Sequence, residues 1–282
     1  MRVTSVDIYA SNSSNFISLS YRDPASKNPF QVKSILGLDA DEITPKFYRV
    51  GSGGMGKYYD LTLSKRDVVV QIALNPTFAL GKSYSGLRDE LYKLISSSRT
   101  GVVQLQFKDG ATTVAAVSGF ITKFESPQFA QSPEVQLTIE CGDPMLRALA
   151  ETVVPIAGLN PQSTVVTDAL STAPHGFRFG VKFTAATVSF SIKDAVAASW
   201  TFAVDLTGSP LVQFAADDEL RLSSEYNNRY LHLIRGGVTT HLVDRIVPNS
   251  VWPVLFPGAN PLVCSNLVQW DHIKHFLTYW GV

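Results

Sequence analysis

The sequence predicts a mainly β protein of two domains with one amphipathic helix. Short apolar or alternating runs recur about every 8–12 residues, which is typical of a sandwich or barrel. Only residues 85–97 show helical periodicity. Residues 135–141 alternate apolar and polar and stop at Gly-Asp-Pro, positions 142–144. Because proline lacks an amide donor and disfavours helix in the preceding residue, this strand ends there. We therefore expect domains at 1–147 and 148–282, with Pro144 fixing the direction of the chain between them.

Composition narrows the class of protein. The 282 residues are 45% hydrophobic, which is ample for packed cores, and carry 24 basic and 24 acidic side chains. A protein that mainly neutralises phosphates would show a basic excess. A net charge of zero suits a subunit that assembles, because like charges do not keep the copies apart. Cys141 and Cys264 are expected to be buried free thiols.

No segment of the sequence suggests membrane insertion. The first residues, 1–7, lack the apolar core of a signal peptide, and no apolar run approaches the 18 residues or so of a membrane-spanning helix. We expect the chain to be made in a cytoplasm.

The first domain is expected to be a β meander interrupted by the helix. Its expected strands are 3–9, 16–21, 30–38, 58–63, 67–74, 102–107, 113–117, 120–125 and 135–141. In the helix, Leu87, Leu91 and Leu94 fall on one face and charged residues on the other. Asp109-Gly110 is a strong hairpin signal. The polar stretch 39–45 and the glycine-rich stretch 51–56 are expected to be loops.

The second domain is expected to be all β after an irregular beginning. Residues 149–173 are rich in Ala, Ser, Thr and Pro, with a loop expected over 155–161 and no strand assigned in this stretch. The expected strands are 177–183, 188–192, 200–206, 211–214, 220–222, 230–234, 239–243 and a closing aromatic strand within 268–282. Gly236-Gly237 predicts a tight hairpin turn.

Residues 51–57, Gly-Ser-Gly-Gly-Met-Gly-Lys, match seven of the eight positions of a phosphate-binding loop. The eighth is Tyr58, which has no compact hydroxyl for magnesium. A phosphate loop also leads into a helix N-terminus, whereas a strand is expected here. We interpret the stretch as a loop between strands and assign no cofactor.

Three residues near the end of the chain have metal-ligand side chains, Asp271, His272 and His275. In a strand, positions three apart point to opposite faces, although a helical turn would bring them together. No third His or Cys lies nearby, so a structural or surface role is expected and no metal residue is assigned. His232 and His241 are expected to form a cross-strand pair.

The acidic run Asp217-Asp218-Glu219 is the main candidate for catalysis. A glycosidase needs two acids at a fixed separation across a sugar, and consecutive acids between strands are more typical of a solvated turn. The sequence contains no G-x-S-x-G, H-E-x-x-H or C-x-x-C motif. We therefore assign no catalytic residue and do not expect an enzyme.

The order of several short motifs along the chain resembles that of a known protein family. In chain order they are Gly37-Leu38-Asp39, the stretch 51–56, Arg66 before an apolar run, Leu91-Tyr92, Asp109-Gly110, Ser118-Gly119-Phe120 and 140–144. This order resembles the N-terminal domain of the distal tail proteins of long-tailed, siphovirus-type bacteriophages. Residues 252–260 and 279–282 resemble the end of that family's C-terminal domain. Residues 150–200 carry no matching motif.

The resemblance implies a structural protein of the virion. It implies an N-terminal β-barrel-like domain with one helix, which forms a hexameric ring, and a C-terminal galectin-like β-sandwich. The ring would join the tail tube to the baseplate hub at the distal end of the tail and let DNA pass. Implied partners are further copies of the chain, the tail tube protein, a hub or tail-associated protein, the tape measure protein, and receptor-binding or fibre proteins. Synthesis would take place in the host bacterial cytoplasm. Galectin-like refers to the fold alone and does not transfer sugar binding.

A second function stays open at this point, a baseplate protein that binds carbohydrate on the host surface. Trp200, Trp252 or Trp270 would then be exposed stacking platforms. Because Trp200 and Trp252 lie within apolar runs, we expect buried core aromatics instead.

Overall fold

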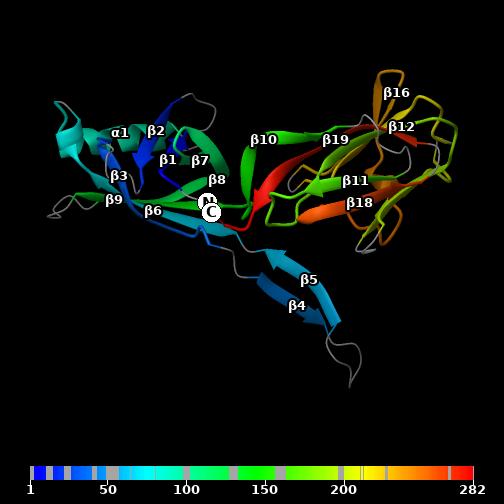
Figure 1. Ribbon diagram of the computed structural model, residues 1–282, viewed down its shortest axis with the longest axis horizontal. Coiled ribbons are helices and arrows are strands. Elements are labelled where there is room, and N and C mark those ends of the chain that lie inside the picture. The colour runs from blue at the N-terminus through cyan, green and yellow to red at the C-terminus, as the bar shows by residue number, and fades with distance from the viewer. Residues whose placement is uncertain are drawn as a thin grey trace. The chain divides into compact units, whose positions relative to one another are not determined.

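The computed structural model describes residues 3–10, 15–21, 27–39, 43–48, 57–63, 65–79, 81–97, 102–126, 133–155, 163–195, 200–209, 211, 213–225, 228–265 and 268–281 (Figure 1). The chain divides into two compact units. Unit 1 comprises Met1–Leu149 with Tyr279–Val282, and unit 2 comprises Ala150–Thr278. The expected boundary between residues 147 and 148 falls inside strand β10 (Leu146–Val154). The described residues confirm a mainly β protein with one α-helix.

Seven strands of unit 1 close into a barrel. They are β1 (Ser5–Tyr9), β2 (Phe16–Ser20), β3 (Phe30–Leu36), β6 (Arg66–Leu74), β7 (Val103–Asp109), β8 (Thr112–Glu125) and β9 (Glu134–Cys141). Their order is β8-β7-β1-β2-β3-β6-β9, and β9 pairs back with β8. The β2–β3 pairing is parallel and joins a single residue pair, Ser20 and Gln31, while the other pairings are antiparallel. Closure leaves these strands without the long free edge of an open sheet.

Strand β9 follows the predicted alternation. Val135, Leu137, Ile139 and Cys141 are buried, and the residues between them are partly exposed. The strand stops at Cys141, as the proline predicts. In the connection to β10, the Met145 amide donates to Asp143 Oδ1 at 3.1 Å. This local hydrogen bond shapes the turn that the Gly-Asp-Pro sequence begins.

Helix α1 (Tyr84–Ser97) confirms the predicted amphipathic helix. Leu87, Leu91 and Leu94 are buried, and the helix contacts β2 and β6 (Figure 1). On its outer side, the Tyr92 ring packs against Phe124 of β8 with 4.4 Å between ring centroids.

Two expectations for unit 1 are wrong. Segments 113–117 and 120–125 form the single 14-residue strand β8. Gly119 lies inside this strand. A Cβ atom at this position would clash with the Glu140 carbonyl oxygen of β9, so glycine allows β8 and β9 to approach closely here. The expected loop 39–45 is also shorter, since strand β4 (Ile43–Tyr48) begins at residue 43 and pairs with β5 (Lys57–Leu63). The glycine-rich stretch 51–56 lies outside the described residues, and the residues after it form a strand.

The described strands of unit 2 lie in two sheets. The first has the order β17-β16-β15-β12-β19-β10 and the second β11-β18-β13-β14. Their strands are β11 (Ser163–Asp168), β12 (Arg178–Phe183), β13 (Ser189–Asp194), β14 (Thr201–Asp205), β15 (Glu219–Ser223), β16 (Tyr230–Arg235), β17 (Val238–His241), β18 (Gly258–Cys264) and β19 (Val268–Tyr279). One buried core joins the two sheets, for example through the rings of Phe179 and Phe190. Unit 2 is therefore a sandwich; its likeness to galectins stays a prediction.

Several local predictions for unit 2 are confirmed. The last strand is β19, Gly236 and Gly237 have positive φ in the β16–β17 turn, and Cys264 is a buried free thiol, as is Cys141 of unit 1. Burial raises the pKa of the Cys264 thiol. The prediction of a strand over 211–214 is wrong, because Phe214 makes only an isolated bridge to Thr187.

The stretch 149–173, in which no strand is expected, contains most of β10 and all of β11. The loop expected over 155–161 lies outside the described residues except for residue 155. In β11 the buried positions are Thr164, Val166 and Asp168, while Val165 is exposed. Two of the three inward side chains are polar, so the apolar alternation that predicts a strand is absent.

Candidate functional site

Strand β19 presents its two histidines to different surroundings. The pairing register with β12 shifts between Gly180 and Val181, which leaves Asp271 as an extra residue in β19. His272 lies opposite Gly180, whereas His275 is buried. The prediction that the two histidines do not share a face is confirmed.

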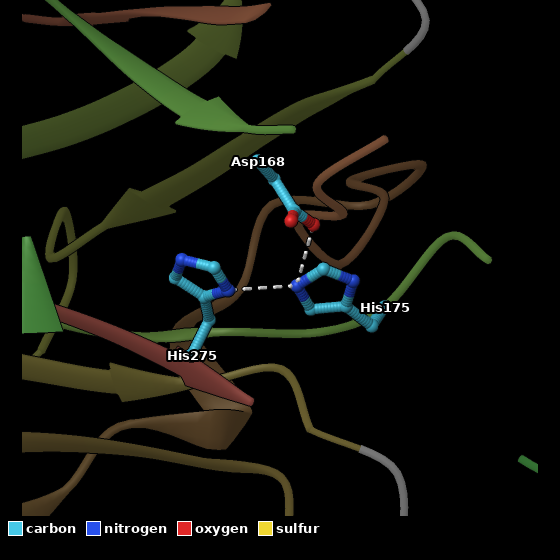
Figure 2. A group of neighbouring side chains, drawn as sticks. All are labelled: Asp168, His175 and His275. Carbon is cyan, nitrogen blue, oxygen red and sulfur yellow. Dashed lines mark hydrogen bonds and ion pairs between the residues drawn. The ribbon is translucent and has the colours of Figure 1, made fainter. Parts of the chain in front are cut away.

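His275 belongs to a cluster with Asp168 and His175 (Figure 2). His175 Nε2 lies 3.1 Å from His275 Nδ1 and 3.5 Å from Asp168 Oδ2. The residues come from the end of β11, the segment before β12, and β19. The expectation that His275 has no further ligand-type side chains nearby is therefore wrong. Asp168 and His175 are far from His275 in sequence. Their position near His275 cannot be predicted without knowing which strands pair.

Backbone contacts hold this cluster in place. The Ser171 amide donates to Asp168 Oδ1 at 3.1 Å, and His175 Nδ1 lies 3.2 Å from the Ala173 carbonyl oxygen. The backbone of His175 exchanges two hydrogen bonds with Leu255 at 2.9 and 3.0 Å. The geometry of the cluster is thus set by main-chain bonds on both sides of the loop that follows β11.

The cluster is buried and only partly hydrogen-bonded. The exposed fractions of Asp168, His175 and His275 are 1%, 9% and 1%. Burial lowers the pKa of His275, although the charges of Asp168 and Glu151 oppose this effect. His275 Nε2 and Asp168 Oδ2 are buried without a hydrogen-bond partner. Such a group can hold a cation, because its ligand atoms all lie within 4.8 Å of one another.

A second group of ligand-type side chains, Glu219, Asp271 and His272, is less buried. His272 Nδ1 lies 2.8 Å from Asp271 Oδ2, and Glu219 pairs with Arg221. The hydrogen bond from His272 lowers the pKa of Asp271 more than burial raises it. Both carboxylates therefore already have donors.

Asp218 is not part of a solvated turn, so that prediction is wrong for this residue. Its side chain is 3% exposed, and Arg235 Nε donates to Oδ1 at 2.9 Å and to Oδ2 at 3.1 Å. The Ala215 amide adds a bond of 2.7 Å. Burial raises the pKa of Asp218, but the bonds from Arg235 and Ala215 together lower it further, so it lies below the ordinary value. Asp217 beside it is exposed, with φ of 66°.

Replacing Asp218 with asparagine should lower the free energy of unfolding by about 1–2 kcal/mol at pH 7, because a charge-assisted bond to a half-exposed arginine is lost. A carboxylate with a lowered folded-state pKa stabilises above its unfolded pKa of about 3.9 and loses this effect as pH falls through the folded-state value. Urea denaturation at pH 7 and at acid pH below about 3.9 measures this. The free energy of unfolding of wild type should fall between the two pH values, and that of Asp218→Asn should fall less. Asp217→Asn is the matched control; equal effects of both variants would contradict the assignment.

The other aromatic and histidine predictions are confirmed. His232 and His241 face each other across β16 and β17, with ring centroids 4.5 Å apart. Trp200 and Trp270 are each 3% exposed. Trp252 is partly buried and packs on Phe202. None of these three tryptophans, which the carbohydrate-binding alternative requires as stacking platforms, is an open surface ring.

The hairpin β4–β5 differs from the barrel strands. Within the part of the chain that the structure describes, β4 and β5 pair only with each other. A two-stranded hairpin in water is marginally stable without packing on another surface. This makes the hairpin a candidate for contact with a partner. No described helix is long and apolar enough to span a membrane.

Comparison with solved structures finds the same fold in a phage protein. The structure of the SPP1 Dit (gp 19.1) protein, described as a paradigm of the hub adsorption apparatus in phages that infect Gram-positive bacteria, matches with a TM-score of 0.60. The match covers 96% of this chain and 98% of SPP1 Dit at 14% identity. The chain shares the fold of SPP1 Dit.

Two structures of the phage p2 baseplate in its activated conformation also match. The structure with Sr has a TM-score of 0.40 at 9% identity and covers 96% of this chain and 97% of that one. The structure with Ca has a TM-score of 0.44 at 7% identity and covers 98% and 97%. No protein-family model matches the chain, and no curated protein matches it.

Proposed function

We propose that the protein is a structural component of a phage tail tip, a hexameric ring that joins the tail tube to the baseplate hub. The observation that carries this proposal is the likeness to SPP1 Dit, which extends over 96% of this chain and 98% of that protein. A match over both units favours a role for the whole chain rather than for one widespread module.

In this proposal unit 1 forms the ring. A closed ring needs two different patches on each subunit, because the same contact repeats head to tail. The hairpin β4–β5 supplies a suitable patch, since its strands have edges that a neighbouring copy can pair with or cover. The barrel of the next subunit supplies the other.

Unit 2 would carry contacts to receptor-binding or fibre proteins, while the ring contacts the tube, hub and tape measure proteins. DNA would pass through the ring in transit only. The net charge of zero supports this role. A strongly basic bore would bind DNA by releasing counterions and slow its passage.

Removing the hairpin should abolish the ring while leaving the barrel folded. Leu36 of β3 pairs with Val69 of β6, so these strands are neighbours and a short glycine–serine linker can replace residues 43–63. Light scattering after gel filtration should give about six times the chain mass for wild type and the mass of one chain for the deletion variant. Circular dichroism checks that the variant is folded.

The matched control alters a turn in unit 2. Gly236→Asn keeps a residue type that tolerates positive φ in the exposed β16–β17 turn, and it should form the same assembly as wild type. A hairpin-deleted variant that assembles as well as wild type would show that the ring interface lies elsewhere.

The carbohydrate-binding alternative gains no support from the structure. Its proposed platforms are buried or covered, since the Arg229 guanidinium lies 5.6 Å from the Trp252 ring centroid. A glycan array remains its direct test, and specific binding to host polysaccharide would revive it.

A further inference from the structure

The buried cluster Asp168–His175–His275 has a hydrogen-bonding problem that protons do not solve. His175 Nδ1 faces the Ala173 carbonyl oxygen, which can only accept, so Nδ1 carries hydrogen. In the neutral ring, Nε2 is then an acceptor. It can accept a hydrogen bond from His275 Nδ1, but Asp168 Oδ2 then faces a lone pair and His275 Nε2 is left without a donor.

Protonating His175 does not resolve the problem. Its single Nε2 hydrogen faces two acceptors, His275 Nδ1 at 3.1 Å and Asp168 Oδ2 at 3.5 Å. If His275 Nδ1 accepts it, His275 carries its hydrogen on Nε2, which is buried and has no partner. In both arrangements one hydrogen serves three facing atoms, His175 Nε2, His275 Nδ1 and Asp168 Oδ2, so one buried lone pair faces another without a donor, which is costly.

A dication placed between the three side chains would bind the lone pairs of Asp168 Oδ2, His175 Nε2 and His275 Nδ1 together. His275 Nε2 would still carry its hydrogen, so the ion accounts for the three facing atoms and not for Nε2. Zinc with bonds of about 2.0–2.2 Å in a tetrahedral site holds its ligand atoms roughly 3.3–3.6 Å apart. The observed separations of 3.1 and 3.5 Å are close to this spacing, and the third pair lies within 4.8 Å. Two imidazoles and one carboxylate suit zinc, whereas magnesium and calcium prefer oxygen ligands.

We propose that Asp168, His175 and His275 bind a zinc ion through Oδ2, Nε2 and Nδ1 (Figure 2). The contact of His175 Nδ1 with the Ala173 carbonyl oxygen is the outer hydrogen bond that orients a zinc-binding histidine. A water molecule completes the tetrahedral set. This proposal concerns unit 2 alone and is independent of the proposed ring.

The role of the ion would be structural. All three side chains are at least nine-tenths buried, so a substrate has little access. The loop after β11 is already fastened to β19, because the Thr172 and Ala173 amides donate to the Thr278 carbonyl oxygen at 3.0 and 3.2 Å. The Thr278 amide in turn donates to Ser171 Oγ at 3.0 Å. Zinc would add a bond between the same two segments.

Strand β19 provides a matched control for this site. His272 lies three residues before His275, is partly exposed, and belongs to the group with Asp271 and Glu219. Its partners already hold hydrogen bonds or ion pairs. His272→Gln and His275→Gln therefore remove the same kind of side chain from one strand but from two different clusters.

The test uses the untagged full-length chain, stripped of metal with a chelator and titrated with zinc. We expect one zinc per chain, and cobalt in its place should give the visible absorption of a tetrahedral site. His275→Gln and Asp168→Asn should each lower the affinity for zinc by at least about 10–100-fold, the usual effect of removing an outer hydrogen-bonding partner of a ligand. His272→Gln should leave the affinity for zinc unchanged. Zinc should raise the Tm of wild type by about 5–10 °C when its free concentration is about 100 times Kd.

Two results would overturn the proposal. One is a folded wild-type chain that takes up neither zinc nor cobalt and whose Tm does not respond to zinc. The other is zinc binding that His272→Gln abolishes and Asp168→Asn leaves intact. If His275→Gln fails to fold, the wild-type titration and the two remaining variants still decide between these outcomes.

Discussion

Phe179→Ala should lower the free energy of unfolding of unit 2 by about 3–5 kcal/mol, the usual cost of truncating a buried phenylalanine. Phe179 is fully buried in the core between the two sheets. Its ring centroid lies 5.6 Å from Phe177, 5.8 Å from Trp270 and 6.3 Å from Phe190. Alanine would leave a cavity and remove all three ring contacts. Urea denaturation followed by tryptophan fluorescence measures the change, because Trp270 reports on the same core.

The control for Phe179 is Phe256→Ala. Phe256 is 40% exposed in unit 2, and its backbone groups bond to Asn260 whatever its side chain is. It should cost much less than Phe179. Equal losses from the two variants would mean that the sheets do not share the packed core described for unit 2.

Arg66→Ala should lower the free energy of unfolding of unit 1 by about 3 kcal/mol, because bonds from a charged group to two carbonyl oxygens are lost. Arg66 is buried at the start of β6. Its Nη1 donates to the Gly37 carbonyl oxygen at 3.1 Å, and Nη2 donates to that of Trp280 at 2.7 Å. The arginine thus fastens the end of the chain to the barrel. Hydrogen exchange should quicken near Trp280 in the variant.

The control for Arg66 is its neighbour Lys65, whose ammonium pairs with Glu140 on the exposed surface. Lys65→Ala removes a positive charge one residue away and should leave the urea denaturation curve almost unchanged. Arg66→Lys should fall between the two, since lysine keeps the charge but lacks the planar fork that reaches two carbonyl groups. An Arg66→Ala curve equal to wild type would show that the chain end is held by other contacts.

Local patterns predict the elements whose cause is local. The alternation of residues 135–141 identifies β9, the leucine spacing identifies α1, and Gly236-Gly237 identifies its turn. In each case the side chains that decide the structure lie within a few positions of one another. The same holds for the strand that follows the glycine-rich stretch, which excludes the phosphate-loop interpretation.

Predictions fail where the cause is a contact between distant residues. Strand β11 has no apolar alternation because Asp168 faces the cluster with His175 and His275. Asp218 is buried because Arg235, 17 residues later, pairs with it. Neither pairing can be read from spacing, since it depends on which strands become neighbours. The Asp–His–His cluster could be predicted only after β11, β12 and β19 were placed in their sheets.

The central claim, that the chain assembles into a six-membered ring, is tested most directly by negative-stain electron microscopy of the purified full-length protein. Class averages should show rings with six-fold symmetry and an open centre. Single particles of one chain at every concentration, together with one-chain particles released from virions, would contradict the ring.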